Sequence, residues 1–496
     1  MAISTPNRPV NNQGAGSNSS ANSGASAGPS AIPAGVMAQR GERRVTLLRS
    51  FMLAFVSASI AFGSLAGIVA WQGNVATSSD YHTIVDEGSV SVDAALRSRA
   101  AALDQMSAAA TYLETAGQAR QAAAQAAARS WDEFNTQARI SWRNISDPTH
   151  GEANVFSAAD TAATDYIQQI GAMFSYAQSG DNTRAGSAFL AARETMNTHL
   201  VPALGGLEAV KVEKMEATYA RADLRIGRWS DTILWVGLLL ALVLLLMLAA
   251  VRRMHYRWSP PIVGALVATL LLTLSSQTEL RQAINDAGML VREAYDNVAG
   301  VQDTAALLSQ ERALSSILVF DPVGTSSHLA DFAQYNTLFE QRLCGPQDCT
   351  AKSFVNGNDS ISPDVVTAAM NEKSKLGLPH IPLVANVFFA GQAAEYEKLR
   401  QDYRNWLATH DKLASQVKLG QLSSATALST GESAQIFSSL KADTDAATAT
   451  ARTEFDNIWK REYTATSIGG ALSLLFPISG LAAAWGLWQR RRELSL

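Results

Sequence analysis

Four apolar stretches without a charged residue or a histidine constrain this chain more than any other feature. They lie at about residues 51–71, 232–251, 261–274 and 467–488. A helix needs roughly 20 apolar residues to cross the hydrocarbon core of a bilayer, so the third stretch must borrow flanking residues on both sides. We therefore predict an all-α membrane protein. Four transmembrane helices alternate in it with two long, polar, helical segments, so the chain repeats one plan twice.

Arginine clusters beside these stretches predict the orientation. Basic residues that flank membrane helices are retained in the cytoplasm, and all three clusters give the same answer. Both termini are therefore expected inside a bacterial plasma membrane, with both long segments outside. The outer portion is rich in acidic residues, and this charge, with its location, excludes nucleic-acid binding. The clusters are Arg40, Arg43, Arg44 and Arg49; Arg252, Arg253 and Arg257; and Arg490, Arg491 and Arg492.

The expected domain boundaries follow from these patterns. The first residues are rich in Asn, Gly, Ser, Ala and Pro, which bury too little surface to offset the entropy of ordering. A cleavable signal has an apolar run of about 7–15 residues near its start, so the longer first stretch is read as an uncleaved anchor. We expect a disordered cytoplasmic tail at 1–45, transmembrane helices at 49–72, 231–251, 259–277 and 466–488, extracytoplasmic helical bundles at 73–228 and 278–465, a cytoplasmic turn at 252–258 and a cytoplasmic tail at 489–496.

The first outer segment has the pattern of an up-down four-helix bundle. Its apolar residues recur at helical spacing, which predicts one buried stripe on each helix. Turn-like residues near 115–117, 146–151 and 179–182 divide it into four runs, and short turns make neighbouring helices antiparallel. Pro202 and the pair Gly205-Gly206 should kink or interrupt the last run. The stripe of the first run consists of Val92, Leu96, Leu103, Met106 and Leu113.

The second outer segment should also be helical, without strand-like alternation. We expect a helix from Thr278 to about 321–322 and others at 326–343, 363–375, 382–419 and 432–463. Cys344 and Cys349 lie between them with no partner residues for a zinc site. In an oxidising compartment they predict a local disulfide, which would contribute about 2 kcal/mol.

No residue pattern typical of catalysis or of a cofactor is present. The chain has no nucleotide-binding glycine loop, no nucleophile elbow and no His-Glu-x-x-His, and its seven histidines are scattered. We predict no enzyme, no catalytic residue, no metal site and no cofactor. Ionisable residues typical of transporters are absent from the apolar stretches. Small residues there should instead pack the spans together, notably Gly63, Gly67, Gly469, Gly470 and Gly480.

One motif points to a ligand. Residues 307–318 read Leu-Leu-Ser-Gln-Glu-Arg-Ala-Leu-Ser-Ser-Ile-Leu, which resembles the signature of nitrate- and nitrite-sensing (NIT-type) ectodomains. The resemblance implies that Arg312 binds a small anion. At 100° per residue Arg312 lies about 140° from Leu307, so only an adjoining helix would enclose it. The alternative is an exposed arginine paired with a nearby acid. The first outer segment resembles, in architecture, the four-helix bundles of chemoreceptors and sensor kinases.

The whole chain resembles actinobacterial membrane proteins of the GlnX type in its topology, size and helical content. That resemblance implies a signal relay between an extracytoplasmic solute-binding protein and a separate cytosolic Ser/Thr kinase or adaptor. The inner side offers this partner, and membrane lipids, only the tail and the arginine clusters at 252–257 and 490–492. The alternatives are a constitutive envelope scaffold and a direct small-anion sensor. A homodimer is left open.

Overall fold

The structure is a computed structural model that describes residues 34–143, 151–255, 259–289, 295–344, 355–356, 360–361, 384 and 393–494. Almost all of these residues are helical, which confirms the all-α class. Residues 1–57 and 58–496 form two compact units. Within the first unit the ring of Phe51 packs edge-on against that of Phe55. The helix that carries these rings continues into the second unit, which holds all the features described below.

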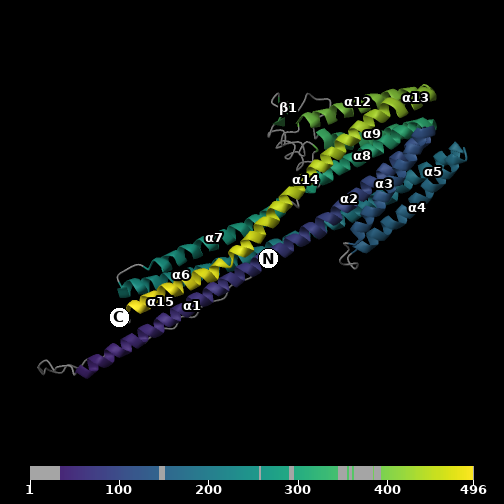
Figure 1. Ribbon diagram of the computed structural model, residues 1–496. Coiled ribbons are helices and arrows are strands. Elements are labelled where there is room, and N and C mark those ends of the chain that lie inside the picture. The colour runs from purple at the N-terminus through teal and green to yellow at the C-terminus, as the bar shows by residue number, and fades with distance from the viewer. Residues whose placement is uncertain are drawn as a thin grey trace, which may run out of the picture. The chain divides into compact units, whose positions relative to one another are not determined.

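The described residues of the first half of the chain form six α-helices, joined in part by π-helical turns (Figure 1). In order they are α1 (Ala34–His82), η1 (Thr83–Ser89), α2 (Val90–Glu114), α3 (Gly117–Arg143), α4 (Glu152–Gln178), α5 (Asn182–Thr195), η2 (Met196–Leu200) and α6 (Val201–His255).

The second half adds further helices and one short strand pair. In order the elements are α7 (Pro260–Met289), α8 (Tyr295–Phe320), η4 (Pro322–Gly324), α9 (Thr325–Cys344), β1 (Val355–Asn356), β2 (Ser360–Ile361), α12 (Ala393–Lys418), α13 (Leu422–Leu428), η5 (Ser429–Ser433), α14 (Ala434–Leu472) and α15 (Leu475–Leu494). The strands pair antiparallel, Val355 opposite Ile361. The sequence had predicted no strand here.

The predicted turns of the first outer segment are confirmed where the structure describes them. Helix α2 ends because Thr115 is extended, and Gly117 then takes a left-handed conformation that L side chains disfavour. Gly180 takes the same left-handed conformation after the end of α4. Asp181 caps α5 by accepting a hydrogen bond from the backbone N–H of Arg184 at 3.0 Å. The third predicted turn, at 146–151, lies outside the described residues except for Gly151.

The predicted interruption near Pro202 takes a specific form. The chain stays helical from α5 into α6, but residues 196–200 form a π turn in which the N–H of Val201 bonds the carbonyl of Met196. Pro202, which has no backbone N–H to donate, follows as the second residue of α6. The pair Gly205-Gly206 lies inside α6 without breaking it. The irregularity is therefore confined to the turn before the proline.

In the second outer segment α8 ends before Asp321-Pro322 and α9 covers the predicted range 326–343. The helix expected from Thr278 is present as the second part of α7, up to Met289, and as α8 from Tyr295, while residues 290–294 between them lie outside the described residues. The predicted helix at 363–375 lies outside the described residues. The one expected at 432–463 begins earlier, since α13 and η5 lead into α14.

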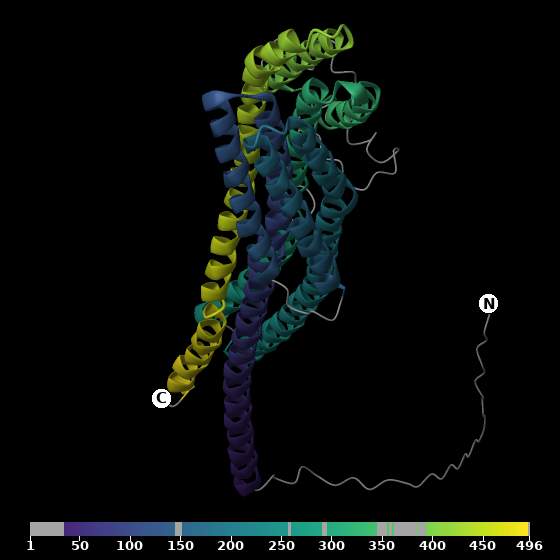
Figure 2. The same cartoon turned by 90° about the vertical axis from the view of Figure 1, so that its right-hand side faces the viewer.

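The two outer segments, predicted as separate bundles, share a hydrophobic cluster, while two smaller clusters belong to the second segment alone. Helix α2 lies beside α8 in both views (Figures 1 and 2). The buried side chains of Met106, Tyr166 and Phe189 from the first segment belong to the same cluster as Leu314 and Ile317 of α8. Residues separated by two apolar stretches in the sequence thus fold as one helical body.

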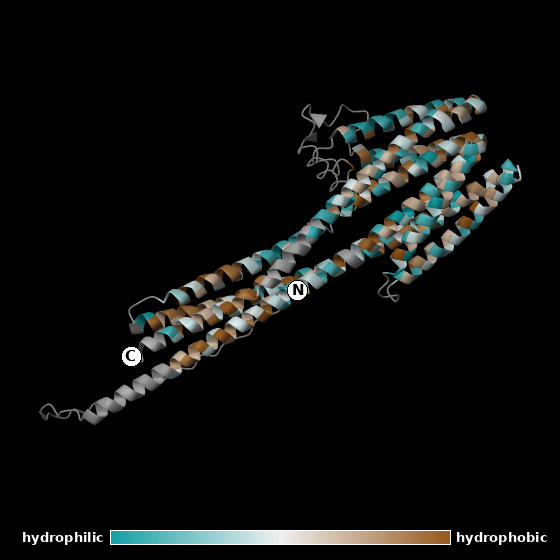
Figure 3. Ribbon diagram, viewed as in Figure 1, coloured by the Kyte–Doolittle hydropathy of each residue, from teal (hydrophilic) through white to brown (hydrophobic). Residues whose placement is uncertain are grey.

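Apolar residues gather on α6, α7 and α15 at one end of this unit (Figure 3). Among the described residues, three helical stretches are long and apolar enough to cross a membrane. They lie within Ser50–His82, Asn182–Arg253 and Pro260–Asp286. The fourth predicted span, 466–488, is divided between α14 and α15 by a turn at residues 473–474. Pro477 follows in the first turn of α15, where a proline is tolerated.

Glycines allow α1 and α15 to approach closely. A Cβ built on Gly480 would lie 2.6 Å from the carbonyl oxygen of Ser59, and one on Gly63 would lie 3.2 Å from the Cα of Gly480. A Cβ on Gly67 would lie 2.7 Å from Cδ of Pro477. This confirms the predicted packing role of these three glycines. Gly469 and Gly470 lie outside the residues whose surroundings the structure describes.

This contact generates a prediction. Gly480→Leu forces the side chain into the backbone of α1, so we expect it to destabilise the protein by about 1–3 kcal/mol. Gly264→Leu is the matched control, because nothing lies within 4 Å of a Cβ at Gly264. The measurement is the thermal unfolding midpoint of the detergent-solubilised protein. Equal midpoints for the two variants would contradict the close packing of α1 and α15.

Candidate functional site

The predicted ligand residue Arg312 lies in the interior of the protein. Its side chain is 2% exposed, and its Nη2 donates to Oε1 of Glu114 at 2.5 Å. Its Nη1 donates to the carbonyl and the hydroxyl of Ser429 and to the hydroxyl of Ser433, at 3.3–3.4 Å. Arg312 is therefore paired with a nearby acid, as the alternative expected, but adjoining helices enclose it and it is not exposed.

The position of Glu114 explains why this pair is needed. Glu114 is the last residue of α2, where the negative end of the helix dipole disfavours a carboxylate. Its two oxygens are nevertheless satisfied, since Oε1 accepts from Arg312 and Oε2 accepts from the hydroxyl of Ser429 at 2.7 Å. A buried charge is tolerated only with such a partner and such hydrogen bonds.

We call Arg312, Glu114, Ser429 and Ser433 the arginine cluster. It joins the end of α2, the middle of α8 and the π turn η5, three elements far apart in the sequence. The anion that Arg312 holds is thus a carboxylate of the protein itself. Small-anion binding by Arg312 stays a prediction, and an added anion would have to displace Glu114.

The neighbouring residue Glu311 forms a second buried network. Its Oε2 accepts from Nε1 of Trp406 at 3.0 Å, and its Oε1 lies 2.9 Å from the hydroxyl of Tyr403. That hydroxyl is also 2.5 Å from Oδ1 of Asn336. One phenolic hydrogen cannot serve both acceptors. A protonated Glu311 resolves this, because it donates to Tyr403 while Tyr403 donates to Asn336.

The pKa of Glu311 agrees with that arrangement. Burial raises this pKa to about 8 and the carboxylate of Glu340 adds to the rise, although the contacts with Tyr403 and Trp406, which can also stabilise the ionised form, oppose it. Burial also lowers the pKa of His410 to about 3. His410 is therefore neutral, stacked on Phe332 and 2.9 Å from the hydroxyl of Ser315. Both His410 and Ser315 are buried.

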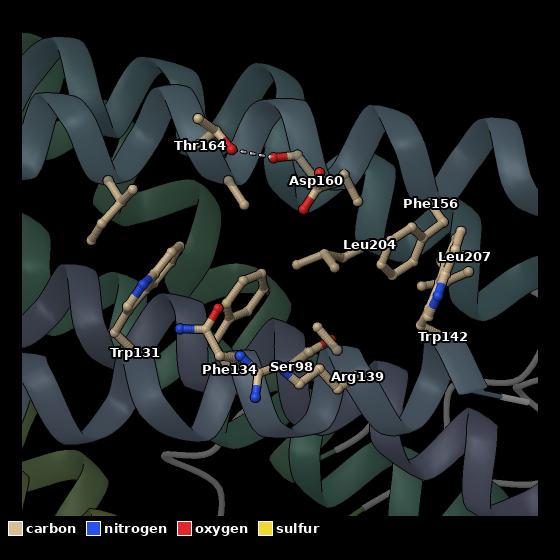
Figure 4. Close-up of a pocket in the computed structure, with 15 residues that line it drawn as sticks. Ser98, Trp131, Phe134, Arg139, Trp142, Phe156, Asp160, Thr164, Leu204 and Leu207 are labelled. Carbon is tan, nitrogen blue, oxygen red and sulfur yellow. Dashed lines mark hydrogen bonds between the residues drawn. The ribbon is translucent and has the colours of Figure 1, made fainter.

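A groove lies between α3 and α4 (Figure 4). Its volume is about 420 Å³. Trp131 and Phe134 of α3 line one part and Trp142 of α3 with Phe156 of α4 line the other. Leu204 and Leu207 of α6 and Ser98 of α2 complete the lining. The groove exists because α3 packs mainly on α2, whereas α4 packs on α5 and α6.

The predicted cytoplasmic arginines lie at two helix ends. Arg252 and Arg253 are exposed at the end of α6, and Arg257 lies outside the described residues. Arg490, Arg491 and Arg492 belong to the last turns of α15, and their side chains are not described. The start of α7 lies against α15, because a Cβ on Gly486 of α15 would lie 3.0 Å from Cβ of Pro261. The partner-binding role of the arginines stays a prediction.

Two further sequence predictions concern cysteines and metals. Cys344 is the last residue of α9, and Cys349 lies outside the described residues, so their disulfide stays a prediction. Within the described ranges no three His, Cys, Asp or Glu side chains are grouped to hold a metal ion.

Sequence reasoning found Arg312 but missed its partners. Glu114 and Ser429 carry no local signal, since only the packing of α2 and η5 on α8 brings them to the guanidinium. Glu311 did carry a local signal in the sequence, because a carboxyl at the edge of the apolar face of Leu307 and Leu314 is unusual. The groove has no signal beyond aromatic residues at helical spacing, which is also typical of a core.

Comparison of the chain with protein-family models, with curated proteins and with solved structures gave no match.

The arginine cluster generates a prediction. Arg312→Leu leaves Glu114 buried without its partner, so we expect a loss of about 3–5 kcal/mol in the free energy of unfolding. The double variant Arg312→Leu with Glu114→Leu should recover part of that loss. Arg184→Leu is the control, because that arginine is 72% exposed and its pair with Asp181 contributes about 1 kcal/mol or less. A loss in the double variant that equals the sum of the losses of Arg312→Leu and Glu114→Leu would show that the two side chains do not interact.

The raised pKa of Glu311 predicts a pH dependence. The unfolded carboxyl loses its proton near its ordinary pKa of 4.5, while the folded one keeps it up to about pH 8. As far as Glu311 contributes, the free energy of unfolding is therefore highest below about pH 4.5, and it falls as the pH rises towards 8. Glu311→Gln should remove this part of the slope, measured as the unfolding midpoint against pH, whereas the exposed control Glu432→Gln should keep it. An unchanged slope in Glu311→Gln would mean that Glu311 ionises normally in the fold.

Proposed function

We propose that this protein is a non-enzymatic transmembrane signal relay. It couples an extracytoplasmic nutrient or ligand signal, received through a solute-binding protein, to a separate cytosolic partner such as a Ser/Thr kinase or an adaptor. In this proposal four helices span the plasma membrane with both termini in the cytoplasm. Residues 73–228 and 278–465 form the extracytoplasmic body.

The continuity of the helices carries the proposal. Helix α6 runs unbroken from Val201 in the bundle, through the apolar stretch, to His255 beside the basic turn. Helix α1 continues through η1 into α2, which ends at Glu114. A rigid helix transmits a shift or a rotation along its axis, whereas a flexible loop would absorb it. A contact made on the outer body can therefore reach the inner surface.

Polar contacts between the helices support the coupling. The arginine cluster ties α2 to α8 and η5. Ion pairs add two links between α14 and α2, from Lys441 to Asp104 and from Arg452 to Asp93, each at 2.8 Å. A partner that prefers one packing of these helices shifts the population of the whole body, provided that the two packings differ by a few kcal/mol.

The inner surface in this proposal consists of the arginines at 252–257 and 490–492. Helix α7 packs on both α6 and α15, so in this proposal the two clusters form one basic patch. Such a patch attracts anionic lipid headgroups and acidic protein surfaces. A small inner surface of this kind suits recruitment of a soluble partner.

Disulfide crosslinking tests the relay. A Cβ on Gly73 would lie 3.3 Å from the Ile233 side chain, so Gly73→Cys with Ile233→Cys reports the packing of α1 on α6. The pair is placed in a chain with Cys344→Ser and Cys349→Ser. We expect its oxidant-induced crosslinking to change when cells are shifted between amino-acid-rich and amino-acid-free medium.

Gly206→Cys with Val155→Cys, a pair within the bundle, is the control, because a Cβ on Gly206 would lie 3.4 Å from Val155. This pair should crosslink equally in both media. Crosslinking of the Gly73 and Ile233 pair that stays the same in both media would contradict a moving relay and favour a constitutive scaffold.

A further inference from the structure

The groove between α3 and α4 has regular walls. On α3 its lining residues Trp131, Phe134, Ala138 and Trp142 follow one another at three or four positions, and Phe156, Ala159 and Ala163 do the same on α4. Large rings thus stand at the two ends of the groove, and alanines lie between them. The groove forms at the alanines, because α3 and α4 do not close over these small side chains.

The rings at each end support one another. Trp131 stacks on Phe134 with ring centroids 4.6 Å apart, and Trp142 lies 4.1 Å from Phe156. Trp142 is nevertheless 48% exposed in a polar part of the protein. The cavity of about 420 Å³ falls in the range of roughly 300–1,000 Å³ that small-molecule sites occupy. Aromatic faces of this kind bind flat or branched apolar groups.

One charge of each sign lines the opposite walls. Arg139 projects from α3 and Asp160 from α4 (Figure 4). In the part of the chain that the structure describes, neither side chain makes an ion pair, although Arg99, Arg193 and Arg312 of the same body each hold a carboxylate. Thr164 bonds only the backbone carbonyl of Asp160. Both charges are therefore available to a ligand.

We propose that this groove binds a small zwitterion with an apolar body, that is, an α-amino acid with an aromatic or branched side chain. The ammonium group faces Asp160, the carboxylate faces Arg139, and the side chain lies between the rings. Each charged contact is of the strong, charge-assisted kind. The proposal is independent of the relay, because the groove lies entirely within α2, α3, α4 and α6 and its occupation is measured as binding.

Calorimetric titration of the purified full-length protein in detergent tests this site. The probes are L-phenylalanine, L-tryptophan and L-leucine, with tryptophan fluorescence as a second readout for L-phenylalanine and L-leucine. We expect saturable binding of at least one probe. For L-phenylalanine, phenethylamine lacks the carboxylate and 3-phenylpropanoate lacks the ammonium group, and each should bind about tenfold more weakly.

Two variants assign the charges. Arg139→Gln should weaken the amino acid about tenfold and leave phenethylamine unaffected, because that probe has no carboxylate. Asp160→Asn should weaken the amino acid similarly and leave 3-phenylpropanoate unaffected. Arg129→Gln on α3 and Asp165→Asn on α4 are the matched controls, since both residues are exposed and lie outside the groove. Each control variant should bind the amino acid with the same affinity as the unmodified protein.

The proposal is overturned by any of three results. The first is the absence of saturable binding for all three amino acids. The second is binding that Arg139→Gln and Asp160→Asn leave unchanged. The third is an equal loss of affinity in the two control variants, which would locate the effect in net charge and not in the groove.

Discussion

Burial of a guanidinium between helices is the constraint on which this fold depends. Arg312 is enclosed on α8, and a buried cation is tolerated only where a carboxylate and further acceptors meet it. Glu114 satisfies this need only if α2 lies beside α8, and Ser429 and Ser433 only if η5 closes over both. One charged pair therefore requires two halves of the chain, each preceded by its own apolar helix, to pack as a single body.

Around that pair the interior is polar but largely neutral. Glu311 keeps its proton because burial raises its pKa, and His410 stays uncharged because burial lowers its pKa. Neutral hydrogen-bonded groups orient α9 and α12 on α8 without the desolvation cost of further buried charges. Some paired charges lie nearer the surface, as between Lys441 and Asp104, whereas the pair of Lys211 and Glu152 is buried.

Much of the local structure could be predicted from the sequence. The ends of α2, α4 and α8 follow from turn residues whose effect is local, namely Gly117, Gly180 and Pro322. Close packing at Gly63 and Gly480 follows from the absence of side chains there. The π turn at 196–200 and the strand pair at 355–361 were not predicted, because such irregularities depend on small differences in backbone hydrogen bonding.

The sequence by itself determined the helical class, the apolar stretches and most helix boundaries, because these properties depend on residues within a few turns of one another. Tertiary structure alone decided which helices meet. No local pattern brings Glu114 to Arg312 or Tyr403 to Glu311, since those pairs are separated by 198 and 92 residues. The groove of Arg139 and Asp160 likewise arises only because α3 packs on α2 and leaves α4 apart from it, a choice made by the whole core.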